Sequence, residues 1–226
     1  MTDHACASAG APPCENNTHM LTIFGRTNSV NVQKVLWCLA EIGIPYERVD
    51  AGLAHGRNCE PWYLALNPNG LIPLLQDGAF TLWESNTIVR YLTGKHAFGG
   101  LYPASPEARA LAERWMDWQL STLVWPVSIV FQNLVRRPPE ERDAGAIARH
   151  TAEANRAVAL LDAHLAKQPY VAGDSFTMGD IPVGATAHRW LEIQGIDRPP
   201  LTALRAWRAR LAERPGFRAH VMLPLS

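Results

Sequence analysis

The spacing of hydrophobic and polar residues near the start of the chain predicts a β-α-β unit. Residues 21–24 alternate weakly, as a half-buried strand does. Apolar residues at positions 32, 35, 36 and 39 share one face of a helix that ends at Gly43. Residues 44–49 then predict a second strand, and two parallel strands joined by a helix require a right-handed crossover.

An irregular segment, a turn, a hairpin and a short helix are expected next. Asn-Pro-Asn-Gly at 67–70 is a strong turn signal. Apolar runs at 72–75 and 79–83, on either side of Asp77-Gly78, favour a hairpin. A short helix should open at Glu84 and stop at Gly94, because a glycine often follows the last turn of a helix.

Helical periodicity dominates the rest of the chain. One helix face continues over four turns and is formed by Leu111, Trp115, Trp118, Thr122 and Trp125. Pro126 should kink this helix without ending it. The pattern breaks at residues 136–139 and resumes over 140–166.

Two helices are expected near the end of the chain. Thr177-x-x-Asp180 resembles a capping box, with Asp in the acidic place, and opens a helix that runs through Trp190. Residues 201–211 predict a last helix, which Pro215-Gly216 stops.

The change of pattern predicts an α/β domain followed by an all-helical domain. Residues 20–95 form the first, residues 107–226 the second, and residues 96–106, with glycines and a proline near their middle, the linker. Residues 1–19 have no periodicity and are interpreted as a disordered N-terminal extension.

Composition and charge exclude several classes of partner. The 226 residues carry 21 basic and 21 acidic side chains, so there is no basic surplus to neutralise nucleic-acid phosphates. Charges interrupt every apolar stretch before the roughly 18 residues that a membrane span needs. Low net charge leaves little self-repulsion, which favours association between copies.

Cysteine and histidine patterns give no sign of a metal site or a disulfide framework. The four cysteines have neither C-x-x-C nor zinc spacing, so reduced thiols in the cytoplasm are expected. The histidines are scattered without paired spacing, and no metal is expected. Residues 1–19 lack the basic start and apolar block of a secretory signal.

Four motifs in the right order resemble the cytosolic glutathione transferases. They are Asn67-Pro68-x-Gly70-x-Ile72-Pro73-x-Leu75, Leu82-x-Glu84-Ser85-x-x-Ile88-x-x-Tyr91-Leu92, Phe176-Thr-Met-Gly-Asp-Ile181 and Arg214-Pro-Gly-Phe217. The resemblance is to bacterial theta-like, serine-type members. It implies a thioredoxin-like N-terminal domain, an all-helical C-terminal domain, a homodimer, and glutathione as co-substrate with no metal or tightly bound cofactor.

The resemblance also implies how glutathione is held. The backbone of Ile72, before a cis Pro73, would pair with the cysteinyl part of the tripeptide. Glu84 would bind the γ-glutamyl ammonium and Ser85 its carboxylate. Ser85 stands at a helix start, where free amides and the helix dipole attract an anion. Without the family pattern a simple cap of its own helix would be the preferred role of this serine, and the resemblance favours the carboxylate contact instead.

Ser29 is the expected catalytic residue. The chain has no tyrosine before Tyr46, which excludes the tyrosine classes, and residues 29–35 are similar to the theta-like serine pattern. Asn31 is a second candidate, because some bacterial members use asparagine to contact the sulfur. Cys38 lies too far along the helix and is interpreted as an inert core thiol.

The remaining contacts are less closely defined. Asn58 is the expected contact for the glycine end of glutathione, with His55 and Arg57 as alternatives. The electrophile is expected between the two domains, near the loop before Ser29 and the helix that carries Trp115, Trp118 and Thr122. An aromatic stripe at helical spacing is also typical of a core, so some of these tryptophans should only hold the helical domain together.

The function predicted from these residues is conjugation of the glutathione thiolate to small apolar electrophiles. One alternative is a glutathione-dependent disulfide or peroxide reductase, which would rely more on Asn31. Another is a non-catalytic scaffold that uses the same fold to bind partners.

Overall fold

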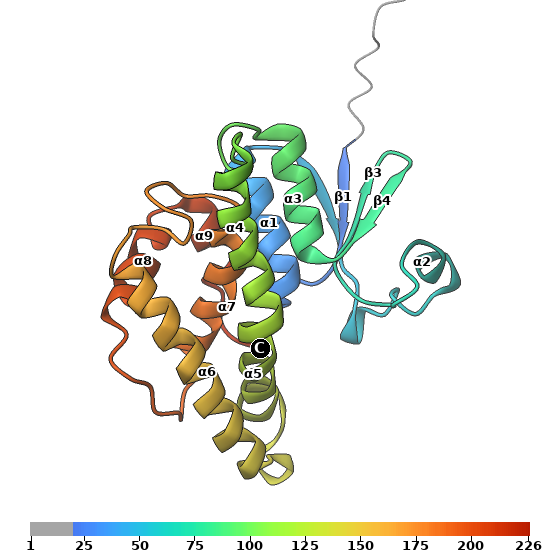
Figure 1. Ribbon diagram of the computed structural model, residues 1–226. Coiled ribbons are helices and arrows are strands. Elements are labelled where there is room, and N and C mark those ends of the chain that lie inside the picture. The colour runs from blue at the N-terminus through green and yellow to red at the C-terminus, as the bar shows by residue number, and fades with distance from the viewer. Residues whose placement is uncertain (1–19) are drawn as a thin grey trace, which may run out of the picture.

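The computed structural model describes residues 20–226. An α/β part lies beside a larger group of helices (Figure 1). The predicted fold class, an α/β domain followed by helices alone, is therefore confirmed. The disorder predicted for residues 1–19 falls outside the described residues.

The α/β part is built on a mixed sheet with the order β2-β1-β3-β4. Strand β1 (Leu21–Phe24) pairs in parallel with β2 (Tyr46–Val49) and antiparallel with β3 (Leu74–Asp77). Strand β3 turns at Gly78 into the antiparallel β4 (Phe80–Trp83). Both the β-α-β unit and the hairpin at Asp77-Gly78 are thus present, as the hydrophobic spacing predicted.

Helices cover both faces of this sheet. Helices α1 (Val30–Ile42) and α3 (Ser85–His96) pack together on one face, and α2 (Pro61–Leu66) lies on the other (Figure 1). The arrangement is that of a thioredoxin-like domain. The short α2 and the single 3₁₀ turn η1 (Leu53–His55) occupy the segment that the sequence pattern described only as irregular. Six residues are too few for hydrophobic periodicity to reveal a helix.

The helical half starts with one long, interrupted helix. Segment α4 (Pro106–Trp118) continues through a π-helical turn (Gln119–Leu123) into α5 (Val124–Phe131) and a second π-helical turn (Gln132–Arg136). Pro126 lies inside α5, so this proline does not end the helix, as expected. A 3₁₀ turn, η4 (Pro139–Glu141), follows.

Four further helices complete this half. They are α6 (Ala144–Leu165), α7 (Asp180–Glu192), α8 (Thr202–Ala212) and α9 (Pro215–His220). Two helix ends differ from the sequence prediction. Helix α3 continues past Gly94 to His96, since its last turn packs and hydrogen-bonds normally through a glycine. Pro215 begins α9 and does not end the helical part, because proline suits the first position of a helix.

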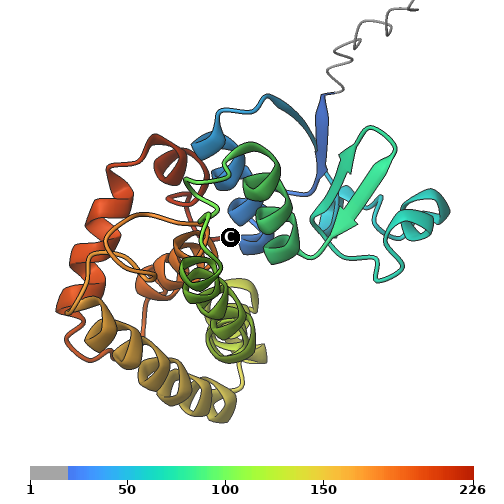
Figure 2. The same ribbon diagram turned by 45° about the horizontal axis from the view of Figure 1, so that its top comes forward.

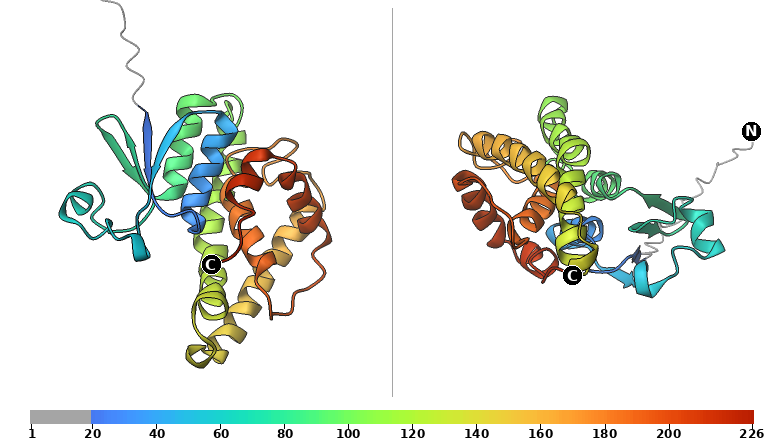
Figure 3. Two further views of the ribbon diagram at one scale, coloured as in Figure 1. Left: turned by 180° about the vertical axis from the view of Figure 1, so that it is seen from behind. Right: turned by 90° about the horizontal axis from the view of Figure 1, so that it is seen from below.

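The interface between the halves is centred on α1. This helix packs against α3 on one side and against α7 and α9 on the other, as the views from behind and below show (Figure 3). The indole of Trp37 is fully buried there, 4.8 Å from the Phe217 ring and 5.6 Å from the Phe176 ring between ring centroids. The helical half therefore determines where the start of α1 lies.

A buried carboxylate holds the start of α7. Asp180 Oδ1 accepts hydrogen bonds from the Val171 amide at 3.0 Å and the Trp207 indole at 3.1 Å, and Oδ2 accepts one from the Thr177 amide at 2.9 Å. Burial raises the pKa of Asp180 to about 6, and this effect is larger than the lowering of the same pKa by the three hydrogen-bond donors. Of the capping box predicted from Thr177-x-x-Asp180, only the bond from the Thr177 amide to the Asp180 carboxylate is present, because α7 begins at Asp180 and its N-cap is Gly179. The carboxylate also links α7 to α8 and to the preceding loop.

Candidate active site

Ser29 is the N-cap residue of α1, directly after the loop that leaves β1. Its backbone is extended, and its side chain accepts no capping hydrogen bond from the helix. The Ser29 hydroxyl therefore does not cap its own helix, although serine at an N-cap commonly does. The hydroxyl lies instead at the positive end of the α1 dipole, where an added anion is stabilised.

A small cleft brings together most of the residues expected to hold glutathione. Its volume is about 50 Å³, and it is lined by Asn31, Asn67, Asn69, Leu71, Ile72, Pro73, Trp83, Glu84 and Ser85. These residues come from α1, from the turn before β3, from the end of β4 and from the start of α3. Neither Ser29 nor Asn58 is among the lining residues.

The turn before β3 presents the backbone of Ile72. The Ile72–Pro73 peptide bond is cis, as the resemblance implied. The carbonyl of Leu71 accepts hydrogen bonds from the Tyr63 hydroxyl at 2.6 Å and from the Asn67 amide at 2.8 Å. Within residues 20–226, no hydrogen bond occupies the Ile72 amide or carbonyl, so both can pair with a peptide.

Glu84 and Ser85 mark the start of α3 on the opposite wall. Glu84 is exposed and has a φ of 71°, a left-handed conformation that is uncommon for a non-glycine residue. Ser85 is buried as the first residue of the helix, where free amides and the dipole attract a carboxylate. A carboxylate side chain and an anion-binding helix end thus stand next to one another.

None of the residues predicted to contact the glycine end of glutathione lines this cleft. The Asn58 side chain donates a hydrogen bond to the Gly70 carbonyl at 2.7 Å and so supports the turn before β3. His55 and Arg57 are both exposed, and Arg57 has a φ of 65°. Contact of Asn58, His55 or Arg57 with glutathione stays a prediction.

Three further properties of the described residues concern metal ligands, the buried thiol and membrane spans. Residues 20–226 contain no group of three or more His, Cys, Asp or Glu side chains placed to hold a metal ion. Cys38 is fully buried, and burial raises the pKa of its thiol, which keeps it protonated and inert, as the sequence suggested. In the same range of residues, every helix is too short or too polar to cross a membrane.

Comparison with protein families covers both halves of the chain. A model of the N-terminal domain of glutathione S-transferases matches residues 19–94, and a model of their C-terminal domain matches residues 144–210. The chain belongs to the glutathione S-transferase family. The resemblance found in the four sequence motifs is thereby confirmed.

Individual relatives extend the family match over nearly the whole chain. Glutathione S-transferase GstB of Escherichia coli is 44% identical over 92% of this chain and 100% of its own length. Glutathione S-transferase 3 of Zea mays is 35% identical, over 89% of this chain and 93% of its own. A theta class glutathione S-transferase of Xanthomonas axonopodis pv. citri, solved with glutathione bound, has a TM-score of 0.88 and 48% identity over 91% of this chain and 99% of its own.

In this glutathione S-transferase a buried lysine connects the cleft to both halves of the molecule. Lys34 is fully buried on α1, three residues after Asn31. Its ammonium donates to Asn31 Oδ1 at 3.0 Å, to Asn86 Oδ1 at 3.2 Å and to Gln119 Oε1 at 3.2 Å, and lies 3.4 Å from Ser85 Oγ. Lys34 therefore positions two candidate glutathione contacts and ties them to the helical half.

Lys34 lies outside the four family motifs of the sequence. Its signal is a lysine at a position that α1 buries, on the same side of the helix as Asn31. Burial lowers the pKa of Lys34 to about 7, the Glu84 carboxylate raises it, and the Arg189 guanidinium lowers it. The oxygen atoms around Nζ provide acceptors for all three ammonium protons, so the charged form is well hydrogen-bonded.

Lys34→Met is expected to remove a pH dependence of stability. The ordinary lysine pKa is near 10.5, so between pH 7 and 9 the unfolded chain binds more protons at this residue than the folded one. The free energy of unfolding of the wild type should therefore rise with pH in this window, by about one to three kcal/mol. Urea unfolding at pH 7 and pH 9 measures this rise.

The difference between variants isolates Lys34 from other titrating groups. In Lys34→Met the increase in the free energy of unfolding between pH 7 and pH 9 should be smaller by about one to three kcal/mol. Lys167 is exposed, so Lys167→Met should show the same increase as the wild type. Equal pH dependence in wild type and Lys34→Met would show that Lys34 has an ordinary pKa in the folded protein.

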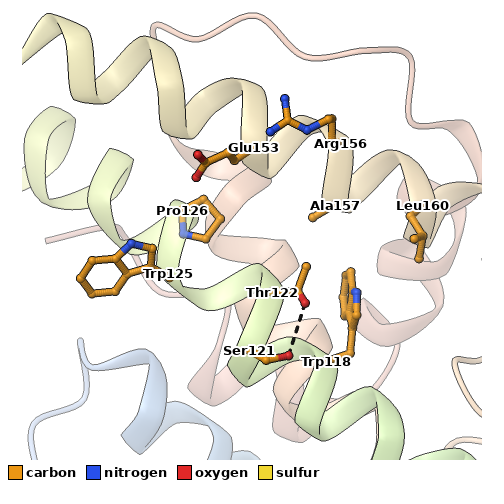
Figure 4. A pocket seen from close by; sticks show the side chains of 9 residues that line it. All are labelled: Trp118, Ser121, Thr122, Trp125, Pro126, Glu153, Arg156, Ala157 and Leu160. Carbon is orange, nitrogen blue, oxygen red and sulfur yellow. Dashed lines mark hydrogen bonds between the residues drawn. The ribbon is translucent and has the colours of Figure 1, made fainter.

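The predicted electrophile residues lie in the helical half. Trp118 and Thr122 line a cavity of about 440 Å³, together with Ser121, Trp125 and Pro126 of the same helix and Glu153, Arg156, Ala157 and Leu160 of α6 (Figure 4). Trp115 is only 6% exposed, packs on Trp118 and His164, and is not among the lining residues. No residue of the loop before Ser29 lines this cavity, so it is not an interdomain pocket.

Proposed function

We propose that the protein is a serine-type, theta-like glutathione transferase that conjugates the glutathione thiolate to small electrophiles. The observation that carries this proposal is the similarity to the glutathione-bound theta class structure, at a TM-score of 0.88 and 48% identity. The joint presence of Ile72, Glu84 and Ser85 around one cleft supports it.

The proposed chemistry needs only groups that border the start of α1 and the cleft. The Ile72 backbone would pair with the cysteinyl unit, Glu84 with the ammonium, and Ser85 with the γ-glutamyl carboxylate. The thiol would then lose its proton near Ser29 and attack an electrophilic carbon. A carbon–sulfur bond forms, and the leaving group departs with its electron pair.

Ser29 and Asn31 are both proposed to stabilise the thiolate. The Ser29 hydroxyl is not engaged in capping, and the α1 helix end adds its dipole. The Asn31 Oδ1 atom is held by the Lys34 ammonium, which leaves the Nδ2 group to donate elsewhere. An amide that donates to sulfur would lower the thiol pKa in the same direction as the hydroxyl.

We also propose that the protein is a cytoplasmic homodimer and that it uses no metal or tightly bound cofactor. Its two domains are proposed to span residues 20–95 and 107–226. Exposed apolar side chains on α5, α6 and the first π-helical turn support the dimer, because Trp125, Leu120 and Leu160 are each more than half exposed. Trp118 and Thr122 remain proposed electrophile contacts, whereas for Trp115, which was predicted with them, burial against Trp118 and His164 favours a packing role.

Glutathione binding should depend on Glu84 and Ser85. Glu84→Gln and Ser85→Ala should each raise the KM for glutathione about tenfold, because a hydrogen bond to a charged group contributes about 1.5–3 kcal/mol. Steady-state kinetics with an activated aryl halide measures this. Ser105→Ala is the control, because Ser105 caps α4 far from the cleft and should leave KM unchanged.

The same assays separate the other candidate functions. A disulfide substrate that turns over much faster than any aryl halide would contradict conjugation and favour the reductase. A protein that neither binds immobilised glutathione nor accelerates a thiol reaction would favour the scaffold. Unchanged KM in both variants would remove Glu84 and Ser85 from the glutathione site.

A further inference from the structure

Hydrogen bonds from two distant side chains hold the loop that leads from β1 to Ser29. At the start of the loop, Arg48 Nη1 of β2 donates to the Gly25 carbonyl at 2.9 Å. At its end, Arg189 Nη2 donates to the Asn28 carbonyl at 3.1 Å. The residue directly before Ser29 is therefore held by a side chain of the helical half.

Arg189 reaches this carbonyl from inside the helical half. Its helix, α7, lies among the other helices of this half and packs against α1 and α5 (Figure 2). Arg189 is 7% exposed, and its guanidinium carbon lies 4.3 Å from the centre of the Phe131 ring. A guanidinium over an aromatic face is attracted to the ring and keeps its donors in one plane. The ring and the Asn28 carbonyl together hold the guanidinium in one place.

Burial makes Arg189 costly to keep in the folded chain. None of the ion pairs within residues 20–226 includes it, and its Nε atom has no hydrogen-bond partner there. Burial lowers the pKa of Arg189 to about 9, and the positive charges of Arg136 and Arg26 lower it further. Its own charge lowers the pKa of Lys34 on the neighbouring α1. An uncharged side chain of similar size would pack here at a lower cost, so this arginine indicates a role beyond packing.

The Asn28 carbonyl determines how Ser29 is oriented. The peptide unit is planar, so the Asn28 carbonyl, the Ser29 amide and the Ser29 Cα atom move as one rigid group. The Ser29 amide donates to the Arg26 carbonyl at 3.3 Å, and the Ser29 carbonyl accepts a hydrogen bond from the Gln33 amide at 2.9 Å, which begins α1. A shift of the Asn28 carbonyl would therefore move the Ser29 hydroxyl and the first turn of α1 together.

We infer that Arg189 is a positioning residue, which holds the Asn28 carbonyl so that the Ser29 hydroxyl can donate to the glutathione sulfur. The inference rests on the proposed function, because it requires a thiolate beside Ser29. Arg189 does not line the cleft that is proposed to hold glutathione. Its loss should therefore change the thiol pKa and kcat, and not the binding of glutathione.

Arg189→Gln should raise the thiol pKa of bound glutathione by about half a unit to one unit, because the Ser29 hydroxyl would no longer be held toward the sulfur. Below that pKa, kcat should fall by the same factor, about threefold to tenfold, while KM for glutathione changes less than about twofold. The ultraviolet absorbance of the thiolate in the enzyme–glutathione complex measures the pKa directly. The pH profile of kcat with an activated aryl halide measures its effect on conjugation.

Arg210→Gln is the matched control. Arg210 also donates to a backbone carbonyl, that of Pro169, at 2.7 Å, lies over the Tyr170 ring, and has a buried Nε atom without a partner in the described residues. It belongs to α8 and contacts the loop after α6, not the loop before Ser29. Arg210→Gln should therefore leave the thiol pKa and kcat unchanged. An equal shift in both variants would overturn the inference, because the shift would then follow from the loss of any arginine of this kind.

A double variant tests whether Arg189 acts through the hydroxyl. In the Ser29→Ala background, Arg189→Gln should raise the thiol pKa by less than about half as much as in the wild type. An undiminished shift would show that the guanidinium charge acts on the thiolate by itself, and the positioning role would be wrong.

Hydrogen–deuterium exchange of the loop separates this inference from the proposed function, because it needs no glutathione. Arg189→Gln should speed exchange of the Ser29 and Gln33 amides at least about threefold, and Arg210→Gln should not. Faster exchange in a protein that conjugates no electrophile would contradict the proposed function and support the role of Arg189 in holding the loop. Exchange, thiol pKa and kcat all equal to those of the wild type would show that Arg189 only packs against Phe131. If Arg189→Gln does not fold, Arg189→Lys, which keeps a donor and the charge, should give smaller changes of the same sign in all three measurements, and wild-type values would again overturn the inference.

Discussion

Ser29→Ala is expected to lower kcat/KM for conjugation at least tenfold, which corresponds to about 1.4 kcal/mol in the barrier. The hydroxyl stands at the N-terminus of α1 without a capping bond of its own. Removing it would deprive the thiolate of one donor while leaving the helix end in place. Stopped-flow or steady-state rates with an activated aryl halide at saturating glutathione would measure the loss.

The size of this effect follows from the pKa of the thiol. A hydrogen bond to a charged group contributes about 1.5–3 kcal/mol, and a helix N-terminus adds about 0.3–1 kcal/mol. One pKa unit corresponds to about 1.36 kcal/mol, so a thiol pKa near 8.5 would fall to roughly 5.6–7.2. Desolvation opposes this shift, which favours the upper end of the range. The rising limb of the pH profile of kcat/KM should therefore move upward by about one unit or more in Ser29→Ala.

Two variants serve as comparisons for Ser29→Ala. Ser105→Ala also removes a serine from a helix start, but at α4, and should leave the pH profile unchanged. Asn31→Ala tests the second candidate. A shifted profile in Asn31→Ala together with an unchanged one in Ser29→Ala would transfer the role to the asparagine.

Asp180→Ala should lower the free energy of unfolding by about 3 kcal/mol, the range expected when a buried polar network loses its centre. The carboxylate satisfies the amides of Val171 and Thr177 and the indole of Trp207. Without it these donors remain buried and unpaired, since Asp180 is fully covered. Urea unfolding followed by tryptophan fluorescence would measure the change.

The matched control for this prediction is Asp174→Ala. Asp174 lies six residues earlier, in the exposed part of the same loop, and should change stability by less than about 0.5 kcal/mol. Because Asp180 is remote from the cleft, the folded fraction of Asp180→Ala should keep its KM for glutathione. A stability equal to that of the wild type would show that the surrounding donors find other acceptors.

Local patterns predicted most of the fold. The alternation of residues 21–24, the helical face through Val32 and Leu39, and the Asp77-Gly78 turn each depend on neighbours in the chain, and each is present. The errors have local causes as well. Helix α2 is too short for periodicity to register, and Pro215 is equally suited to follow a helix or to begin one.

Some residues of the candidate site could likewise be predicted from local motifs, and others could not. The motifs around Ile72-Pro73 and Glu84-Ser85 are contiguous, and the sequence alone placed them together through a family resemblance. Lys34 has no such motif, since its partners are Asn86 on α3 and Gln119 in the helical half. The tryptophans show the reverse case, because periodicity put Trp115 and Trp118 on one face while packing buried the first and left the second beside a cavity.

The sequence by itself predicted the order of the elements other than α2, identified the family and supplied the proposed glutathione contacts, because these depend on periodicity and on short runs of residues. Only the tertiary structure decided which charges are buried and which face one another. Arg26, Arg136 and Arg189 are more than fifty residues apart in sequence, and packing of α5 and α7 against the loop before Ser29 brings them together. Burial strengthens electrostatic effects, and burial is set by contacts between distant segments, which no local pattern contains.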